Sequence, residues 1–171
     1  KIRYNLIAKQ NEALQEALNF TERQKKLYNY KFLIAQVVAN SSNPYDPTIK
    51  INLGSHDGVK EKMAVTTVDG LVGLVSRVSE FTSTVTPITE LDETSPTSNL
   101  IAATIMGRED ESFGIISGYD NDSDRLIMTK IPENDQMIVG DTVITSGLGN
   151  VYPRGLVIGT VESKEAGDFG L

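Results

Sequence analysis

The pattern of apolar and polar positions divides the chain into a short first part and a long second part. Residues 1–31 contain no glycine or proline and are rich in Leu, Ala, Gln, Glu and Lys, which are good helix formers. From residue 32 onward, short apolar stretches are separated by turn residues every eight to twelve positions. This second pattern is typical of β barrels or sandwiches, so the sequence predicts one leading helix followed by a mainly β region.

The predicted helix carries a narrow and imperfect apolar seam. Its positions recur in sevens or lie beside that line: Ile7, Leu14, Ala17, Leu18, Thr21 and Tyr28. An isolated helix with so thin an apolar stripe is marginally stable in water. We therefore expect it to have a partner, most simply a second copy of itself in a coiled-coil dimer. The alternative is a helix that packs on its own domain.

The β region divides at a polar connector, Leu91–Asn99, and contains a tight hairpin signal at Asp69-Gly70. Strands are predicted at 32–40, 49–54, 63–68, 71–79, 84–90, 100–107, 113–118, 125–131, 140–147 and 155–163. The expected parts are a coiled-coil helix at 1–31, a first β unit at 32–92, a second β unit at 93–155, and C-terminal strands at about 156–171 that could return to complete the first unit.

Charge and composition narrow the function classes. Residues 1–31 carry a net charge of +4, and residues 32–171 carry −11. An acidic body does not suit nucleic-acid binding, which requires cations to neutralise phosphates. The basic start suits a solvated helix face, or a surface facing anionic lipid or acidic protein. The chain has no cysteine, which excludes disulfides and thiolate metal sites.

Membrane and export signals are also absent from the sequence. No apolar stretch approaches the roughly 18 residues that a membrane span needs. The chain begins with neither an initiator Met nor a signal peptide, so we expect it to be a fragment of a longer protein.

Ser146 and the glycines after it are the first candidates for chemistry. A hydroxyl nucleophile needs a base and an orienting acid, and the only histidine in the sequence is His56, in the turn Gly54–Gly58. The residues around Ser146 lack the G-x-S-x-G frame of a nucleophile elbow. The G-x-G at Gly147–Gly149 is followed by Tyr152 where a dinucleotide-binding loop has glycine. We expect this segment to be a bend between strands.

Two acidic runs are the remaining candidates. Asp120–Arg125 begins like a calcium loop, but Arg125 stands where the loop has Gly and Ile131 where it has Glu. This run and Arg108–Glu111 are interpreted as acidic hairpin turns. Glycosidase carboxylates would need a sugar cleft lined by aromatic residues, and the sequence has no Trp. We expect no catalytic residue, no metal and no cofactor.

Two longer segments, Thr48–Ser79 and Gly140–Val161, each contain a characteristic series of turn residues. The residues that carry it are Gly54, Asp57, Gly58, Asp69, Gly70, Gly73, Gly140, Asp141, Ser146, Gly147, Pro153, Gly155 and Gly159. Their order and separation, with the heptad helix in front, resemble the MreC family of bacterial rod shape-determining proteins over nearly the whole chain. One departure is Lys62, where many members carry glycine.

The resemblance implies a fold and a location. MreC proteins have a short cytoplasmic start, one membrane-spanning helix, a coiled coil and a β-rich domain outside the membrane. This chain would be the extracytoplasmic part of such a single-pass cell-membrane protein. Its β region would form two small six-stranded barrels, arranged as in chymotrypsin-like proteases but without their catalytic residues. Residues 32–90 supply about five strands, so strands at about 156–171 could complete the first barrel.

The resemblance also implies a function. The chain would be part of a membrane-anchored homodimeric scaffold that organises lateral peptidoglycan synthesis and maintains rod shape. Its partners would be MreB, MreD and the penicillin-binding peptidoglycan synthases. Two alternatives stay open: a serine hydrolase on a two-barrel frame, and an envelope adaptor of the membrane-fusion type. Adaptors of that type have two antiparallel helices, whereas this sequence predicts one.

Overall fold

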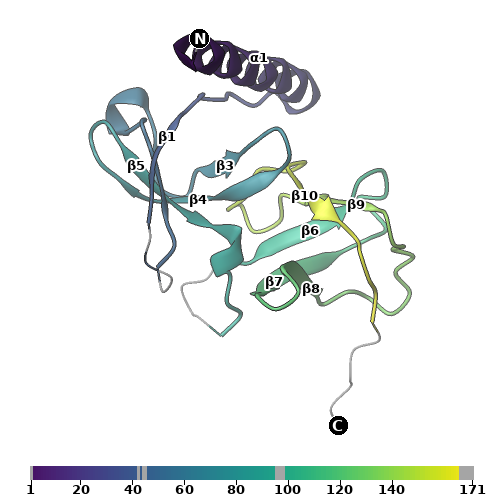
Figure 1. Cartoon of the computed structure of the whole chain (residues 1–171). Helices are drawn as coiled ribbons and strands as arrows, with labels where there is room; N and C mark the ends of the chain where they lie inside the picture. The colour runs from purple at the N-terminus through teal and green to yellow at the C-terminus, as the bar shows by residue number, and fades with distance from the viewer. Residues whose placement is uncertain (1, 42, 44–45, 95–98, 166–171) are drawn as a thin grey trace.

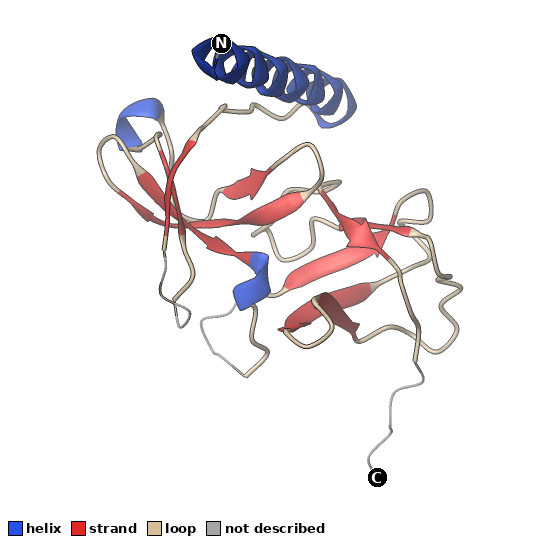
Figure 2. Cartoon of the chain, in the orientation of Figure 1, coloured by secondary structure: helices blue, strands red, loops and turns tan. Residues whose placement is uncertain are grey.

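The computed structural model describes residues 2–41, 43, 46–94 and 99–165, apart from the side chains of residues 2–7 and 24. Within these residues, one α-helix precedes ten strands and two short 3-10 helices. The elements are α1 (Ile2–Tyr28), β1 (Val37–Asn40), β2 (Ile49–Ile51), η1 (Ser55–Asp57), β3 (Ala64–Thr66), β4 (Leu71–Val78), β5 (Ser83–Pro87), η2 (Ile88–Glu90), β6 (Ile101–Ile105), β7 (Gly114–Asp120), β8 (Arg125–Thr129), β9 (Thr142–Thr145) and β10 (Val157–Thr160). The predicted mainly β chain with a leading helix is confirmed (Figure 2).

Helix α1 ends three residues earlier than the sequence predicted. Asn29 adopts the left-handed conformation, with φ of 55°, and its N–H donates to Lys25 O at 2.9 Å. Asparagine tolerates this conformation better than most residues and so terminates helices. None of the described helices combines the length and apolar character that crossing a membrane requires.

The strand predicted at 32–40 is shorter than expected, because β1 begins only at Val37. The first residue of that stretch, Phe32, packs its ring edge-on against Phe20 of α1, with ring centroids 6.1 Å apart. This aromatic contact holds the chain against the helix at Phe32, and β1 begins only after the chain has left the helix. Figure 1 shows this segment doubling back under α1 before it enters β1.

The strands form two antiparallel five-stranded sheets. The first has the order β1-β2-β5-β4-β3, and the second has the order β10-β9-β6-β7-β8. In Figure 1, α1 lies above the first sheet, and the second sheet lies beside it toward the C-terminus. Each predicted strand after residue 40 has a counterpart in these sheets.

Two expectations about the barrels are wrong for the described residues. Six strands were expected in each barrel, whereas each sheet has five. The C-terminal strands at about 156–171 were expected to be able to complete the first barrel. Instead β10 pairs with β9 in the second sheet, with Val157 opposite Ile144 and Thr160 opposite Thr142. Thr145 of β9 is hydrogen-bonded to Gly155 N and Leu156 N, just before β10, and these contacts hold the two strands side by side. Residues 166–171 lie outside the described part of the chain.

The hairpin predictions are confirmed. Asp69-Gly70 joins β3 to β4, which pair antiparallel, and Thr67 N donates to Gly70 O at 2.8 Å. Asp120–Arg125 joins β7 to β8, with Asp120 opposite Arg125 in the register. The connector at 91–99 is described only in part, since residues 95–98 lie outside the described chain.

The larger apolar core crosses from one sheet to the other. Leu71 and Leu74 of β4 pack in the same cluster as Ile101 and Ile105 of β6 and Leu156 beside β10. A smaller cluster belongs to the first sheet alone: Ile51, Val59, Val75 and Val85. The sheets are therefore joined by a shared core, which fixes how the surfaces of one lie relative to those of the other.

Candidate functional site

The two sequence motifs, although far apart in the chain, meet in space. Gly70, in the β3–β4 turn, has φ of 152°, and a Cβ placed on it would lie 2.9 Å from Val157 O of β10. The absence of a side chain at Gly70 therefore permits the backbone of the first sheet's hairpin to approach the second sheet. Gly70 is therefore a structural part of the junction between the sheets.

The first motif is a compact turn around η1. Asp57 accepts a hydrogen bond from Gly54 N at 3.0 Å, and Gly58 closes the turn with φ of 87°. Side chains at Gly54 or Gly73 would collide with neighbouring backbone, at Ser79–Glu80 and Thr86 respectively. Asp69 belongs to the β3–β4 hairpin described above. These residues act through backbone geometry.

The second motif is organised around buried Thr145. Thr145 Oγ1 donates to Pro153 O at 2.5 Å and accepts from Leu156 N at 2.9 Å, while Gly155 N donates to Thr145 O at 2.8 Å. The expected bend at 147–149 is confirmed, with φ of 80° at Gly147 and 86° at Gly149. The β9–β10 loop is thus tied to the strand that precedes it.

The remaining motif residues border the same loop. Asp141 forms an ion pair with Arg108 and accepts from Ile138 N at 2.8 Å. Gly140 has φ of 94°, and its N–H donates to Val161 O at 2.8 Å. Gly159 on β10 has open space where a side chain would be. Asp141 therefore anchors the segment before β9, and Gly140 links it to the end of β10.

The candidate nucleophile and base have local partners of their own. Ser146 Oγ accepts from Leu148 N at 3.3 Å, within the β9–β10 loop. His56 lies on the first sheet's side, in η1, where its ring is 5.7 Å from that of Phe81 and its backbone N–H donates to Glu80 O. Each residue is therefore explained by the turn in which it lies.

The acidic turns also hold themselves together. Asp120 accepts from Ser123 Oγ at 2.5 Å and from Asp122 N at 3.0 Å, and the hydroxyl of Ser123 is the main cause of the lowered pKa of Asp120. Arg125 pairs with Glu162 through two N–H···O contacts of 2.5 and 2.6 Å. Among the described residues, no group of three His, Asp or Glu side chains is placed to hold a metal ion.

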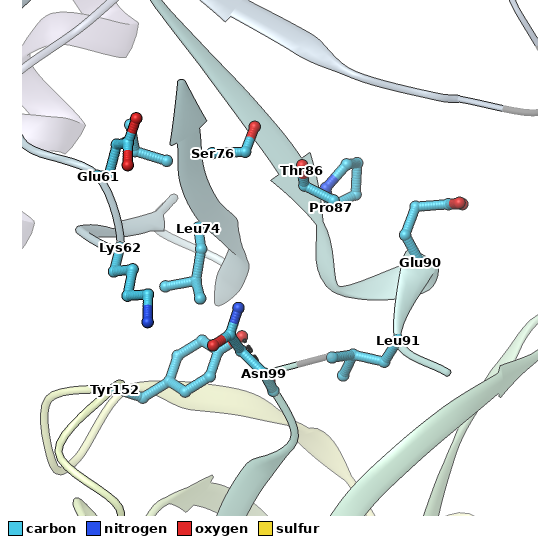
Figure 3. A pocket seen from close by; sticks show the side chains of 11 residues that line it. Glu61, Lys62, Leu74, Ser76, Thr86, Pro87, Glu90, Leu91, Asn99 and Tyr152 are labelled. Carbon is cyan, nitrogen blue, oxygen red and sulfur yellow. Dashed lines mark hydrogen bonds between the residues drawn. The ribbon is translucent and has the colours of Figure 1, made fainter. Parts of the chain in front are cut away.

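A cleft of about 360 Å³ lies where the two sheets adjoin. Its lining comes from both halves of the chain: Glu61, Lys62, Leu74, Val75, Ser76, Thr86, Pro87, Glu90, Leu91, Asn99 and Tyr152. Figure 3 shows Tyr152 and Asn99 facing Leu74 and Lys62 across it. Tyr152 donates to Asn99 O at 3.2 Å, and burial raises the pKa of Tyr152 to about 12. The phenol of Tyr152, which lines the cleft, is therefore neutral at physiological pH.

Lys62, the departure from the family pattern, lies at the rim of this cleft. Its φ is 66°, in the left-handed region where glycine is at ease, and its N–H donates to Val75 O at 2.7 Å. The turn keeps the conformation that glycine would favour, although a lysine occupies it. The turn therefore accommodates a lysine in this conformation.

The residues of the predicted helical seam have different environments. Leu14 and Leu18 are exposed, at 43% and 46%, whereas Ala17 is half-buried. Thr21 Oγ1 donates back to Leu18 O at 2.8 Å. Tyr28 packs on Gly155 of the same chain. The side chain of Ile7 lies outside the described part of the structure.

Sequence reasoning missed one surface, the outer edge of the first sheet. All four residues of β1 are exposed, including Val37 at 61% and Val38 at 54%. The signal was present in the sequence, because the stretch 32–40 contains neither a charged residue nor a proline. Such residues normally protect an exposed strand edge.

Comparison with known proteins places these features in a family. The family model for the barrel core of rod shape-determining protein MreC matches residues 37–171. The cell shape-determining protein MreC of Listeria monocytogenes is 37% identical over 165 residues, which are 96% of this chain and 53% of the relative. MreC of Bacillus subtilis is 34% identical over 168 residues, 96% of this chain and 57% of the relative. The chain thus spans about half the length of these relatives.

Solved structures show the same fold. A structure of MreC superimposes with a TM-score of 0.77 at 27% identity and covers 96% of this chain and 86% of that one. MreC of Listeria monocytogenes gives a TM-score of 0.71 at 32% identity, with 99% and 81% covered. With both motifs, the two joined sheets and these matches in agreement, the chain belongs to the MreC family of rod shape-determining proteins.

Proposed function

We propose that this chain is the extracytoplasmic part of a membrane-anchored dimeric scaffold that organises lateral peptidoglycan synthesis and maintains rod cell shape. Its relatives are named cell shape-determining proteins, and a structural neighbour is described as the major periplasmic domain of such a protein. The anchor is an N-terminal membrane helix that precedes this chain. The chain binds partners and catalyses no reaction.

The observation that carries this proposal is the unprotected edge at β1. A strand edge presents unpaired backbone N–H and C=O groups to any extended segment that approaches it. In β1 these groups are accompanied by exposed valines, and no charge occurs between residues 32 and 40. An incoming strand would gain backbone hydrogen bonds and apolar contacts without meeting a repelling charge.

The other three sheet edges are shorter or better protected. Strand β3 has three residues; β10 has four, as β1 does, but Gly70 of the β3–β4 turn lies close against its Val157 O. Strand β8 begins with Arg125, which pairs with Glu162. Short length and charge are the devices by which proteins discourage strand addition. The contrast singles out β1 as the edge that is left available.

The partner that we assign to this edge is an extended segment of a penicillin-binding peptidoglycan synthase. Strand addition gives affinity through the backbone and specificity through alternate side chains. Dimerisation through α1 places two such edges on one anchor, which raises the effective concentration of each docking site. MreD and MreB are reached through the membrane and cytoplasmic parts of the whole protein.

The docking edge is tested by placing a charge on it. Val38→Lys in the whole protein removes the synthase signal in a bacterial two-hybrid assay and fails to restore rod shape to cells lacking the protein. Ile127→Lys is the matched control, because Ile127 is a comparably exposed residue on the edge strand β8. A synthase signal that survives Val38→Lys as well as it survives Ile127→Lys would exclude β1 as the docking edge.

The dimer is tested separately on the helix. Leu14→Asp introduces a charge into the exposed seam and yields the monomer mass in light scattering, with an unchanged β circular-dichroism signal. Leu27→Asp is the control, since Leu27 is 70% exposed on the same helix but outside the seam. Equal masses for both variants and the unmodified chain would contradict dimerisation through the seam.

A further inference from the structure

The end of α1 is seated on the β9–β10 loop. The ring of Tyr28, the last residue of the helix, covers Gly155 so closely that a Cβ placed there would be 2.5 Å from the phenol oxygen and 2.6 Å from Cε2. Gly155 is buried and has φ of 85°. Glycine is needed here for two reasons, the left-handed backbone and the closeness of the ring.

A second tyrosine reinforces the same contact. Tyr30 stacks on Tyr28, with ring centroids 5.7 Å apart and an angle of 17° between the planes. The hydroxyl of Tyr30 donates to Arg154 O at 3.1 Å, next to Gly155 in the chain. Offset aromatic pairs at this separation add stability beyond that of the area they bury. Arg154 and Gly155, which are neighbours in the loop, are therefore each contacted by one of the two tyrosines.

The aromatic contacts continue back to the body of the helix. Tyr30 contacts Phe32 at 6.5 Å, and Phe32 contacts Phe20 of α1 at 6.1 Å, both edge-on. The chain that leaves the helix is thereby held along it instead of swinging free. A rotation of α1 relative to the sheets would have to break the contacts at Phe20 as well as those at Tyr28.

The receiving loop is rigid for reasons that do not involve the helix. Buried Thr145 binds the loop at Pro153, Gly155 and Leu156 through hydrogen bonds of 2.5, 2.8 and 2.9 Å. Contact with this loop through two tyrosines therefore attaches the end of α1 to the second sheet and also limits the direction in which α1 can point.

We propose that Tyr28, Tyr30, Arg154 and Gly155 form an aromatic latch that fixes the direction of α1 relative to the second sheet. The latch sets the angle at which the sheets are carried by the rod that leads to them. It also occupies Tyr28 within its own chain, so the part of the helical seam that is free for a second copy ends at Thr21. The latch is intramolecular and does not depend on the proposed function.

The latch is tested by measuring the distance between α1 and the second sheet. The chain has no cysteine, so Glu12→Cys on α1 and Ile127→Cys on β8 give two unique sites for spin labels. The distance is measured by pulsed electron–electron double resonance on doubly labelled chain that is diluted in excess unlabelled chain. The dilution ensures that the intramolecular distance is observed whether or not the chain dimerises. We expect one narrow distance peak.

Two alanine substitutions separate the latch from backbone strain. Gly155→Ala and Gly149→Ala each add a methyl group at nearly the same positive φ, 85° and 86°. Only the methyl group at Gly155 meets Tyr28, since Gly149 has open space. Gly155→Ala therefore broadens or shifts the distance peak, and Gly149→Ala leaves it in place. Identical peaks for both variants would overturn the latch.

Variants on the helix side keep the test decisive if Gly155→Ala fails to fold. Tyr28→Ala removes the ring without touching the loop and broadens the peak. Tyr30→Phe keeps the stacked ring but loses the hydrogen bond to Arg154 O, and gives a smaller broadening. A peak that stays narrow in Tyr28→Ala would show that other contacts orient α1.

Discussion

The two sheets have the same number of strands but divide the buried apolar side chains unequally. The cluster confined to the first sheet consists of Ile51, Val59, Val75 and Val85. The cluster of the second sheet is larger and also takes in Leu71, Leu74 and Ile88 from the first sheet's half of the chain. Most of the buried apolar side chains therefore lie in or against the second sheet, and the first sheet is held in place partly through this shared cluster.

This difference matches the surfaces that the sheets present. The first sheet ends in β1, all of whose residues are exposed, while the second sheet holds the loop that receives α1. A sheet that leaves an edge open for a partner gains less burial from its own fold. The molecule thus assigns stability and orientation to one sheet and, in our proposal, docking to the other.

The largest expected effect compares the same substitution in the two cores. Ile101→Ala removes a side chain with 0% exposure from the larger cluster and lowers the free energy of unfolding by about 4 kcal/mol. Ile51→Ala, in the smaller cluster and opposite Val37 of the open edge, lowers it by about 2 kcal/mol. Urea unfolding of both variants measures the difference. Equal losses would contradict the unequal division of the core.

The next effect concerns a buried carboxylate of the second sheet. Asp135 is 7% exposed and accepts from Met137 N at 2.8 Å, Ser112 Oγ at 3.0 Å and Phe113 N at 3.2 Å. Asp135→Ala leaves these buried donors without an acceptor and lowers the free energy of unfolding by about 3 kcal/mol. Asp122→Ala, on an exposed turn, is the control and changes it little. A similar thermal midpoint for both variants would show that water replaces the carboxylate.

The third effect is a pH dependence at the junction of the sheets. Burial raises the pKa of Tyr152 in the folded chain to about 12, whereas a tyrosine in the unfolded chain has a pKa of about 10. The contribution of the neutral phenol to the free energy of unfolding is therefore fully present below pH 10. As the pH rises toward 12, the free energy of unfolding falls by on the order of 2 kcal/mol. Tyr152→Phe lacks this loss, so its stability relative to the unmodified chain improves between pH 9.5 and 12. A constant difference over that interval would place the phenol in water.

The sequence predicted the strands well because their signals are local. Alternating apolar residues and turn signals such as Asp69-Gly70 depend on near neighbours, and the structure has a strand for each predicted stretch. The early end of α1 and the late start of β1 depend on contacts across the fold. The apolar and β-branched stretch 32–40 predicts a strand that includes Phe32, whose ring instead packs against Phe20.

The candidate surfaces were predicted less completely, for a related reason. The motif glycines were identified, but their contacts were not, since Gly155 is a turn residue in sequence and a seat for Tyr28 in the structure. The pairing of β10 depends on a strand beside it in space, which a count of strands cannot choose. Long-range contacts decide both cases, and one sequence contains little information about them.

The smallest effect concerns the turn at the rim of the cleft, in the less stable sheet. Lys62 has φ of 66°, a conformation that costs a residue with a side chain about 1 kcal/mol. Lys62→Gly removes that cost but gives the unfolded chain extra freedom worth about 0.5 kcal/mol, so the folded state gains about 0.5 kcal/mol.

Lys60→Gly is the matched control for that turn, because Lys60 lies two residues earlier and does not have a positive φ. Lys60→Gly relieves no strain and only increases the freedom of the unfolded chain, so the free energy of unfolding falls by about 0.5 kcal/mol. Opposite signs in paired urea titrations would locate the strain at Lys62, whereas a loss in both variants would show that the lysine side chain contributes contacts that outweigh it.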